Sequence, residues 1–316
     1  MDLLKQVPGA RSLGATSNRD EWLAVRRGGI GGSDAGAIMG LNPYASPLTV
    51  WMEKTGRTVN DVDNAAIRFG VMLEPVLREH AAEWIRDEFD LGPGAVNVYE
   101  LTDDDGNPIT LASKSYPFML ANVDGLVQTD NGRGDTEWAV LEIKTAGERQ
   151  ASKWADGEVP DSYYVQVQHY LAVTGLERAI VVALVGRDIV IREVPRNDDF
   201  VKRMREAEAE FWAMVREDDP PAPTGREAED EALLALYPDG EGEVVDASLE
   251  TNVREYNELG EEIKRLEAER KRQAQTIKAA IGEGKTLIAG EYRASWSRFE
   301  RSSIDSKRLA AELPDA

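Results

Sequence analysis

Two predicted β-strands, residues 119–127 and 138–145, constrain the fold of this chain more than any other part of its sequence. The first strand contains Asp124, and the second contains Glu142 and Lys144. Because side chains alternate across a strand, Glu142 and Lys144 share one face, and the aliphatic residues beside them point into the core. The intervening residues are rich in Gly, Asp and Asn, which is typical of a hairpin loop. If the strands pair as neighbours, Asp124 lies beside Glu142.

These side chains suggest a metal site. Carboxylate oxygens suit a hard divalent cation such as Mg²⁺ or Mn²⁺. A lysine beside such an ion can orient a water molecule or stabilise a developing charge. The alternative for the pattern taken alone is a half-exposed hairpin without a ligand, so other parts of the chain have to decide between the two.

The composition fits a globular protein with a full core, and 316 residues are enough for about two domains. No apolar run approaches the ~20 residues of a membrane span, and the N-terminus lacks the apolar segment of a signal peptide. There is no cysteine, which excludes disulfides and thiolate metal sites, and two histidines make a zinc centre a poor fit. The expected location is therefore cytoplasmic.

The formal net charge of −21 argues against a protein that coats DNA regardless of sequence, because such a surface needs an excess of basic residues. It leaves room for a nuclease. One local basic channel can lie within an acidic exterior, and bound cations offset the carboxylates of a site.

A glycine-rich segment, GGIGGSDAGAIMG (28–40), predicts a tight turn followed by a short helix with Ser33 or Asp34 as its N-cap. A helix N-terminus behind glycines can bind an anion. The segment is not a Walker loop, since no Gly-Lys-Ser/Thr follows. It is not a Rossmann fingerprint, since the third glycine and the preceding strand are missing. The alternative is a capped helix without a ligand.

Residues 64–89 are predicted to form a long helix in which Glu74 lies among apolar residues. The predicted apolar stripe consists of Phe69, Met72, Leu73, Val76, Leu77 and Trp84. A carboxylate beside such a stripe is costly unless it has a partner. Glu74 is therefore either a third metal ligand or a surface glutamate at the edge of the stripe.

Residues 161–174 are predicted to form a second helix, on which Tyr163, Gln166 and Tyr170 share one face. Gln166 and Tyr170 are either polar groups beside a site or amphipathic side chains that pack on a sheet. Two apolar strands, 178–185 and 189–194, follow this helix.

The predicted organisation has three parts. Residues 1–218 form the main domain, residues 219–246 an acidic, Pro-rich linker, and residues 247–316 a C-terminal extension with a long charged helix and a hairpin. That helix either mediates assembly or partner binding, or folds back on its own domain.

Five motifs in order carry a family resemblance: WLAVRRGGIGGSDAGAIMGLNPYASPLTVWMEKTG, FGVMLEP, NVDG, LEIKT and YVQVQHY. Together they resemble the YqaJ-type viral recombinases, relatives of phage lambda exonuclease within the PD-(D/E)xK superfamily. The resemblance covers about residues 20–195. It implies an α/β fold with a restriction-endonuclease-like core, in which helices flank a central mixed sheet, followed by the C-terminal helical and β-hairpin extension.

The resemblance also implies roles for individual residues. Those matching the metal-binding carboxylates are Glu74, Asp124 and Glu142. Lys144 matches the catalytic lysine, and Gln166 and Tyr170 match the Gln-x-x-x-Tyr helix beside the catalytic site. Arg26 and Ser33 match the residues that hold a 5′-phosphate. In one departure from the family pattern, Asn122 and Val123 replace the proline that precedes the aspartate. That proline is not a metal ligand.

The implied activity is that of an Mg²⁺-dependent (or Mn²⁺-dependent) exonuclease that digests one strand of duplex DNA from its 5′ end. It would leave a 3′ overhang for a single-strand annealing protein in phage-type homologous recombination. The family further implies a ring-shaped homo-oligomer and a phage or prophage protein in a bacterial host. Two alternatives are another PD-(D/E)xK nuclease, structure-specific or RecB/Cas4-like, and a non-catalytic module that binds DNA ends or a partner. The absence of cysteine disfavours the RecB/Cas4-like subtype with an iron–sulfur cluster.

Overall fold

The computed structural model describes residues 2–57, 64–130, 136–238 and 248–297. The chain divides into two compact units, Met1–Gly240 and Glu241–Ala316. Every candidate site residue named above belongs to the first unit.

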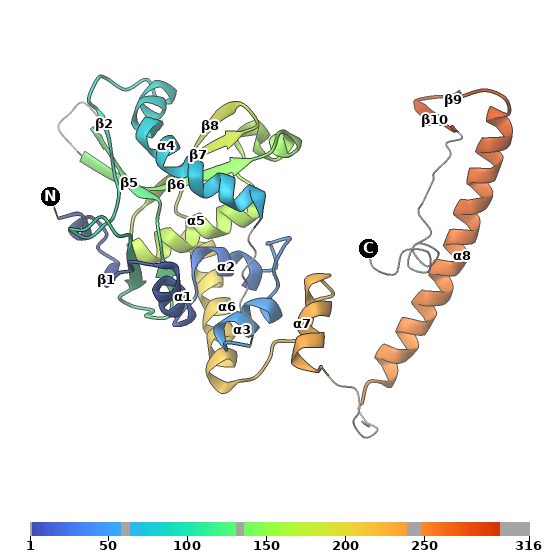
Figure 1. Cartoon of the computed structure of the whole chain (residues 1–316), viewed down its shortest axis with the longest axis horizontal. Coiled ribbons are helices and arrows are strands. Elements are labelled where there is room, and N and C mark those ends of the chain that lie inside the picture. The colour runs from blue at the N-terminus through green and yellow to red at the C-terminus, as the bar shows by residue number, and fades with distance from the viewer. Residues whose placement is uncertain (1, 58–63, 131–135, 239–247, 298–316) are drawn as a thin grey trace, which may run out of the picture. The chain divides into compact units, whose positions relative to one another are not determined.

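A five-stranded mixed sheet forms the centre of the first unit (Figure 1). In spatial order the strands are β2 (Val96–Tyr99), β5 (Gly125–Asp130), β6 (Thr136–Ala146), β7 (Arg178–Val185) and β8 (Asp188–Pro195). β6 and β7 run parallel, and the other neighbours pair antiparallel. β7 is aliphatic along most of its length, as expected for a strand that is covered on both faces.

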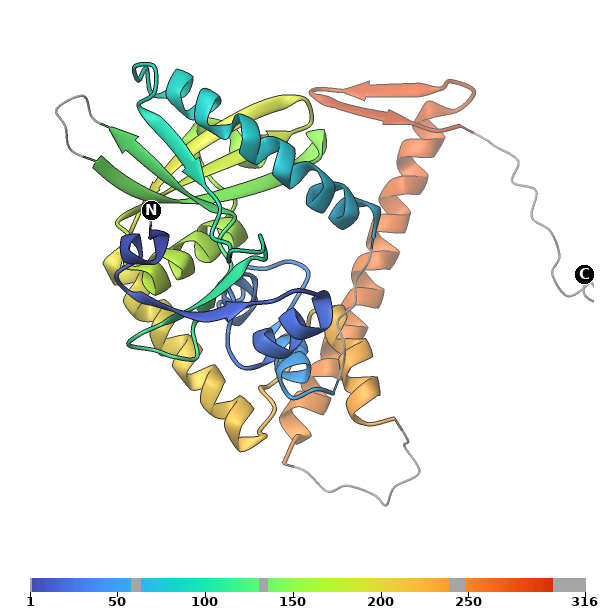
Figure 2. The same cartoon turned by 60° about the vertical axis from the view of Figure 1, so that its left-hand side comes forward.

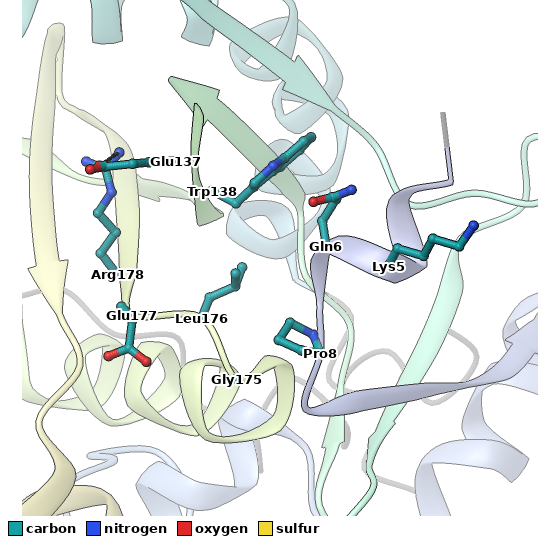
Figure 3. A pocket seen from close by; sticks show the side chains of 9 residues that line it. All are labelled: Lys5, Gln6, Pro8, Glu137, Trp138, Gly175, Leu176, Glu177 and Arg178. Carbon is teal, nitrogen blue, oxygen red and sulfur yellow. Dashed lines mark ion pairs between the residues drawn. The ribbon is translucent and has the colours of Figure 1, made fainter. Parts of the chain in front are cut away.

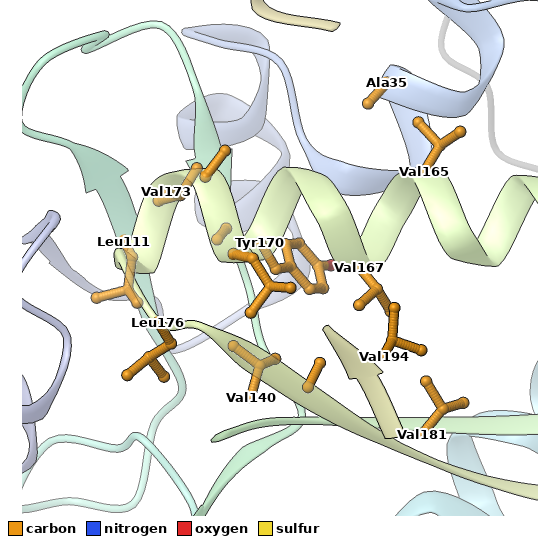
Figure 4. Close-up of a cluster of buried hydrophobic side chains, with 14 of the residues drawn as sticks. Ala35, Leu111, Val140, Val165, Val167, Tyr170, Val173, Leu176, Val181 and Val194 are labelled. Atoms are coloured by element: carbon orange, nitrogen blue, oxygen red, sulfur yellow. The ribbon is translucent and has the colours of Figure 1, made fainter. Parts of the chain in front are cut away.

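Helices cover both faces of this sheet (Figure 2). α4 (Ala65–Glu88) packs one stripe of small and aliphatic residues on the first face. α5 (Asp161–Thr174) packs on the second face, in the cluster of buried side chains drawn in Figure 4. The predicted core, a central mixed sheet flanked by helices, is confirmed.

The alternation of side chains along β6 assigns its polar residues to one face. Leu141 and Ile143 belong to the cluster under α4, whereas Val140 belongs to the cluster under α5. Because alternate residues share a face, Glu142 and Lys144 point to the α5 side. Both faces are covered, so the half-exposed hairpin is excluded: Glu142 is only 1% exposed.

A smaller antiparallel sheet lies beside the first, with strand order β1 (Ala10–Ala15), β3 (Ile109–Ser113) and β4 (Leu120–Ala121). A single parallel bridge between Ile30 and Met119 attaches the glycine-rich segment next to it. This connection places the segment against the start of the region that carries Asp124.

Four further helices of the first unit pack around a third apolar cluster. They are α2 (Gly32–Ile38), α3 (Pro47–Lys54), α6 (Asp198–Glu217) and α7 (Ala228–Leu236). α1 (Arg19–Arg27) contacts α3 and has no buried residue. Two 3₁₀ segments, Leu3–Gln6 and Glu148–Gly157, complete the described elements of this unit.

The glycines before α2 serve close packing rather than an unusual backbone conformation, since none of them has a left-handed φ. A Cβ on Gly29 would lie 2.5 Å from the carbonyl oxygen of Phe118. A Cβ on Gly32 would lie 2.6 Å from Cε1 of Tyr170. The N-cap of α2 is Gly31, not the predicted Ser33 or Asp34.

Helix α7 lies within the segment predicted as a linker, 219–246, and packs on the first unit. Ala232 is buried in the third apolar cluster, and the guanidinium of Arg226 donates hydrogen bonds to main-chain carbonyls between α2 and α3. The boundary predicted after residue 218 therefore falls inside the packed body. Proline and acidic residues suggested a linker, but the apolar side chains of α7 bury against α3.

Two further predictions about the first unit need correction. The predicted strand 119–127 is two strands, β4 and β5, with Asp124 directly before β5. In α4 the predicted apolar stripe is only partly buried: Phe69 and Met72 are 50% and 63% exposed, whereas Leu77 is buried as predicted, together with Ala81 and Ile85, which the prediction left out. The exposed residues belong to the first half of the helix.

The second unit consists of α8 (Glu250–Ile281) and a hairpin of β9 (Thr286–Ala289) and β10 (Tyr292–Ser295). The predicted helical and hairpin extension is confirmed, and the predicted strand residues 298–299 lie outside the described residues. Among the described helices of both units, none is long and apolar enough to cross a membrane.

Gly32→Ala is expected to lower the free energy of unfolding by about 1–3 kcal/mol, because the added methyl group would overlap atoms of Tyr170 and Gln166. The matched control is Gly92→Ala, since a Cβ there meets no atom within 4 Å. Urea denaturation of both variants measures the difference. Equal effects at the two positions would contradict the close contact between α2 and α5.

Candidate active site

Asp124, directly before β5, lies beside Glu142 of β6, as the sequence predicted. Gly125 pairs with Leu141 in the antiparallel ladder, so the next pair in register is Asp124 with Glu142. The main-chain N–H of Ile143 donates a hydrogen bond of 2.6 Å to Oδ2 of Asp124. This contact fixes the orientation of the Asp124 carboxylate against β6.

Lys144 lies on the same face of β6 as Glu142 and forms an ion pair with its Oε1. The ammonium also sits 5.0 Å from the ring centroid of Tyr163 on α5, a cation–π distance. Burial lowers the pKa of the Lys144 ammonium, but Glu142 and Asp124 outweigh it, so that the net pKa is raised. Lys144 therefore remains charged.

Helix α5 adds two polar groups to the same face. Nε2 of Gln166 donates a hydrogen bond of 2.7 Å to Oε1 of Glu142 and another of 3.1 Å to the hydroxyl oxygen of Tyr170. The two residues are one helical turn apart, so one side of α5 supplies both. Of the two readings left open by the sequence, the structure favours polar groups that contact the candidate carboxylates.

Glu74 comes from α4, on the other side of the sheet, and reaches the group from the end of β6. One turn earlier on the helix, a Cβ on Gly70 would lie 3.2 Å from Oγ1 of Thr145, which shows how closely α4 approaches this end. The Glu74 carboxylate pairs with Arg78, which also forms an ion pair of 2.9 Å with Glu100.

Negative charge is crowded at this site. Burial, followed by the charge of Asp124, raises the pKa of Glu142 to about 8 against the opposing effect of Lys144. Burial also raises the pKa of Asp124, and burial together with Asp124 raises that of Glu74. The three carboxylates therefore lack part of the positive charge that would keep them all ionised at neutral pH.

The donor set fits a hard divalent cation in its chemistry. All three candidate ligands offer carboxylate oxygens, and Oε2 of Glu142 is buried without a hydrogen-bond partner. Across residues 2–57, 64–130, 136–238 and 248–297, however, no three His, Asp or Glu side chains are grouped as a ready ligand set. Glu74 is held by Arg78 instead, so the metal-ligand roles of Glu74, Asp124 and Glu142 stay a prediction.

A cavity of about 240 Å³ lies between Asp124 and the glycine-rich segment. Its lining includes Asp124, Gln166 and Tyr170 on one side and Arg26 and Ser33 on the other. Nη2 of Arg26 donates a 2.7 Å hydrogen bond to Oγ of Ser33. The residues predicted from two separate motifs thus open onto one space.

Asp34, predicted only as a possible helix cap, contacts Arg26 on the side away from the cavity. Oδ1 of Asp34 accepts a hydrogen bond of 2.8 Å from Nη2 of Arg26, and Oδ2 forms an ion pair of 2.7 Å with Nζ of Lys54. Burial raises the pKa of the Asp34 carboxyl, but Arg26 and Lys54 outweigh burial and hold the net pKa well below its usual value. Asp34 is therefore ionised inside the protein.

Three basic or aromatic partners were missed from the sequence: Arg78, Tyr163 and Lys54. Lys54 lies in an apolar helix, and its position four residues from Val50 could have indicated a buried ammonium that needs a carboxylate. Arg78 follows Glu74 by one turn, a spacing that favours an ion pair. Tyr163 was placed on the correct face of its helix but without its contact to Lys144.

A larger cavity of about 520 Å³ lies at the opposite end of β6 and β7, between Trp138, Leu176 and Arg178 (Figure 3). Arg178 there forms ion pairs of 3.0 Å with Glu137 and Glu193. None of the candidate site residues lines this cavity.

Comparison with known proteins gives a family match over the region of the site. The YqaJ-like viral recombinase domain matches residues 21–177. The protein YqaJ of Bacillus subtilis (strain 168) is 33% identical over 306 residues, which cover 94% of this chain and 89% of that protein. Protein D345L of African swine fever virus (strain Badajoz 1971 Vero-adapted) is 35% identical over 77 residues, 24% of this chain and 20% of that protein.

Two solved structures are similar at low sequence identity. The crystal structure of LHK-Exo in complex with dAMP is 21% identical, with a TM-score of 0.47, and the match covers 70% of this chain and 98% of that chain. The structure of the alkaline exonuclease LHK-Exo from Laribacter hongkongensis is 19% identical, with a TM-score of 0.47, and the match covers 69% of this chain and 100% of that chain.

Asp34→Asn is expected to lower the free energy of unfolding at pH 7 by about 3–5 kcal/mol, because it leaves the buried Lys54 without its carboxylate. The folded-state pKa of Asp34 is depressed, so its contribution is complete above the unfolded pKa of about 3.9 and is lost as the pH falls below that value. Urea unfolding should therefore show the difference between wild type and variant shrinking from pH 5 to pH 3. A difference that does not change with pH would contradict this account.

Proposed function

The chain belongs to the YqaJ-like viral recombinase family, and from this premise we propose that it is a metal-dependent exonuclease that digests one strand of duplex DNA from the 5′ end. The observation that carries the proposal is the single cavity that joins the carboxylate group around Asp124 to Arg26 and Ser33. An exonuclease needs both features: a centre for phosphodiester hydrolysis and a place for the end of the strand.

Glu74, Asp124 and Glu142 would hold Mg²⁺ or Mn²⁺, which when bound supplies Lewis-acid stabilisation of the scissile phosphate. The pairing of β5 with β6 supports this assignment for Asp124 and Glu142, because it puts two acidic side chains at one point. The buried, unpartnered Oε2 of Glu142 supports it further.

Lys144 would orient the water that attacks the phosphorus atom. Its ammonium is held between the Glu142 carboxylate and the Tyr163 ring, which restricts its position before substrate arrives. Gln166 keeps Glu142 in place through the hydrogen bond to Oε1, and Tyr170 contacts Gln166 in turn. Preorganised groups of this kind stabilise developing charge without having to reorganise during the reaction.

Arg26 and Ser33 would bind the phosphate at the 5′ end. A guanidinium and a hydroxyl that already contact each other can both donate hydrogen bonds to phosphate oxygens. Binding there would favour 5′-phosphorylated ends. The product, a duplex with a 3′ overhang, is the substrate of a single-strand annealing protein, which we propose as the partner in recombination, together with a ring-shaped homo-oligomer around DNA.

Asp124→Asn and Lys144→Met are expected to reduce digestion of linear duplex DNA in Mg²⁺ by a factor of 10² or more, in line with the loss of a preorganised charged group. Mn²⁺ should raise the melting temperature of the wild type but raise that of Asp124→Asn less, a readout that does not depend on activity. The matched control is Glu137→Gln. Glu137 is on β6, as Lys144 is, but its side chain is 59% exposed and pairs with Arg178 at the opposite end of the strand. A folded Asp124→Asn variant with full activity would reject the assignment, and a wild type that binds DNA ends without cutting them would favour a binding module.

Ser33→Ala and Arg26→Ala are expected to reduce the preference for 5′-phosphorylated ends, because each removes a donor from the proposed phosphate site. Initial rates on duplexes that differ only in a 5′-phosphate or a 5′-hydroxyl measure the preference. Removing a hydrogen bond to a charged group costs about 1.5–3 kcal/mol, or roughly 10- to 150-fold in the ratio of rates. Equal rates of wild type on the two ends would count against the site.

A further inference from the structure

A buried carboxylate lies directly behind the proposed terminal-phosphate site and belongs to neither the site nor the metal group. Asp34 is 3% exposed, and each of its oxygens has a charged partner: Nη2 of Arg26 at 2.8 Å and Nζ of Lys54 at 2.7 Å. Oδ2 also accepts a hydrogen bond of 2.9 Å from the main-chain N–H of Gly31. Asp34 therefore connects the cavity-lining arginine to the turn that begins α2 and to the last residue of α3.

The guanidinium of Arg26 is held from several directions by these contacts. One nitrogen, Nη2, serves both Asp34 and Ser33. The Arg26 Nε lies 3.6 Å from the carboxylate of Glu53, and the guanidinium carbon lies 5.1 Å from the ring of Trp22. An arginine side chain carries about 2 kcal/mol of rotamer entropy when it is free, so fixing it in advance leaves less entropy to lose when a phosphate binds.

Lys54 offsets the negative charge of Asp34 inside the protein. Its side chain is 0% exposed, and its ammonium also donates a hydrogen bond of 3.0 Å to the main-chain carbonyl oxygen of Arg26. Arg26 and Lys54 carry two positive charges against the two negative charges of Asp34 and Glu53. The group is thus neutral by itself, and its part in phosphate binding depends on where the Arg26 guanidinium points rather than on surplus charge.

We propose that Asp34 is a positioning residue for the recognition of the 5′-terminal phosphate: it fixes the planar guanidinium of Arg26 against Ser33, and Lys54 only offsets its buried charge. This proposal rests on the proposed function. It goes further by making the preference for a phosphorylated end depend on a residue that has no contact with the DNA.

The matched comparison is between Lys54→Met and the double variant Asp34→Asn/Lys54→Met. The single variant keeps the contact between Asp34 and Arg26, and the double variant removes it. Both lack the buried ammonium, so the double variant leaves no unpaired buried lysine, and asparagine can still accept the hydrogen bond from Gly31. A second double variant, Asp34→Ser/Lys54→Met, also removes the carboxylate without leaving a buried lysine unpaired, and it provides the test should the first double variant fail to fold.

Two readouts are measured with full-length protein on short duplexes carrying a 5′-phosphate or a 5′-hydroxyl. The first is kcat and KM in Mg²⁺, and the second is binding in EDTA by fluorescence anisotropy of the labelled duplex. Lys54→Met should keep the wild-type preference. The double variant should lose about tenfold in the ratio of kcat/KM between the two ends, through a higher KM on phosphorylated ends, with the hydroxyl-ended duplex unaffected.

The outcomes separate the proposal from its alternatives. A purely structural role for Asp34 would lower the rates on both ends alike and leave their ratio unchanged, which would overturn the proposal. A wild type with no preference in either readout would overturn it as well. A wild type that cuts no DNA would refute the proposed function, whereas the anisotropy ratio in EDTA would still decide the role of Asp34.

Discussion

The pairing of β5 with β6 is the constraint on which the candidate site depends. One register places Asp124 opposite Glu142, and a shift by one residue would turn every side chain of β6 to the other face. The hydrogen bond from Ile143 to Asp124 adds a second fixed point. Because helices cover both faces, this register also keeps the acidic side chains away from bulk water, which gives them their raised pKa values.

Two charged groups of opposite character lie on either side of one cavity. Around Glu142 the carboxylates outweigh the nearby cations, so that positive charge is lacking. Around Asp34 the carboxylate is fully compensated by Arg26 and Lys54 and remains ionised. In the proposed reaction the first group would attract a divalent cation, and the second would hold an arginine ready for a phosphate. The contrast arises from partners and not from residue type, since both groups are built on buried acids.

The sequence predicted the central sheet, the helices α4 and α5, and the neighbouring positions of Asp124 and Glu142, because each rests on local periodicity or on strand alternation. It could not predict which face of the first half of α4 is buried, because Phe69 and Met72 fit an apolar stripe as well as Leu77 does. It also missed the contacts of Lys54 and Arg226. These join elements far apart in the chain, and no local pattern encodes such a pairing.

The close approach of α2 to α5 at Gly32 has a consequence for how relatives of this chain can diverge. The backbone at Gly32 and the ring of Tyr170 share one small volume, so the sizes of the two side chains are not independent. A lineage that enlarges residue 32 would first have to shrink residue 170 or separate the helices. Substitutions at the two positions should therefore appear together across a set of relatives, as paired changes of volume.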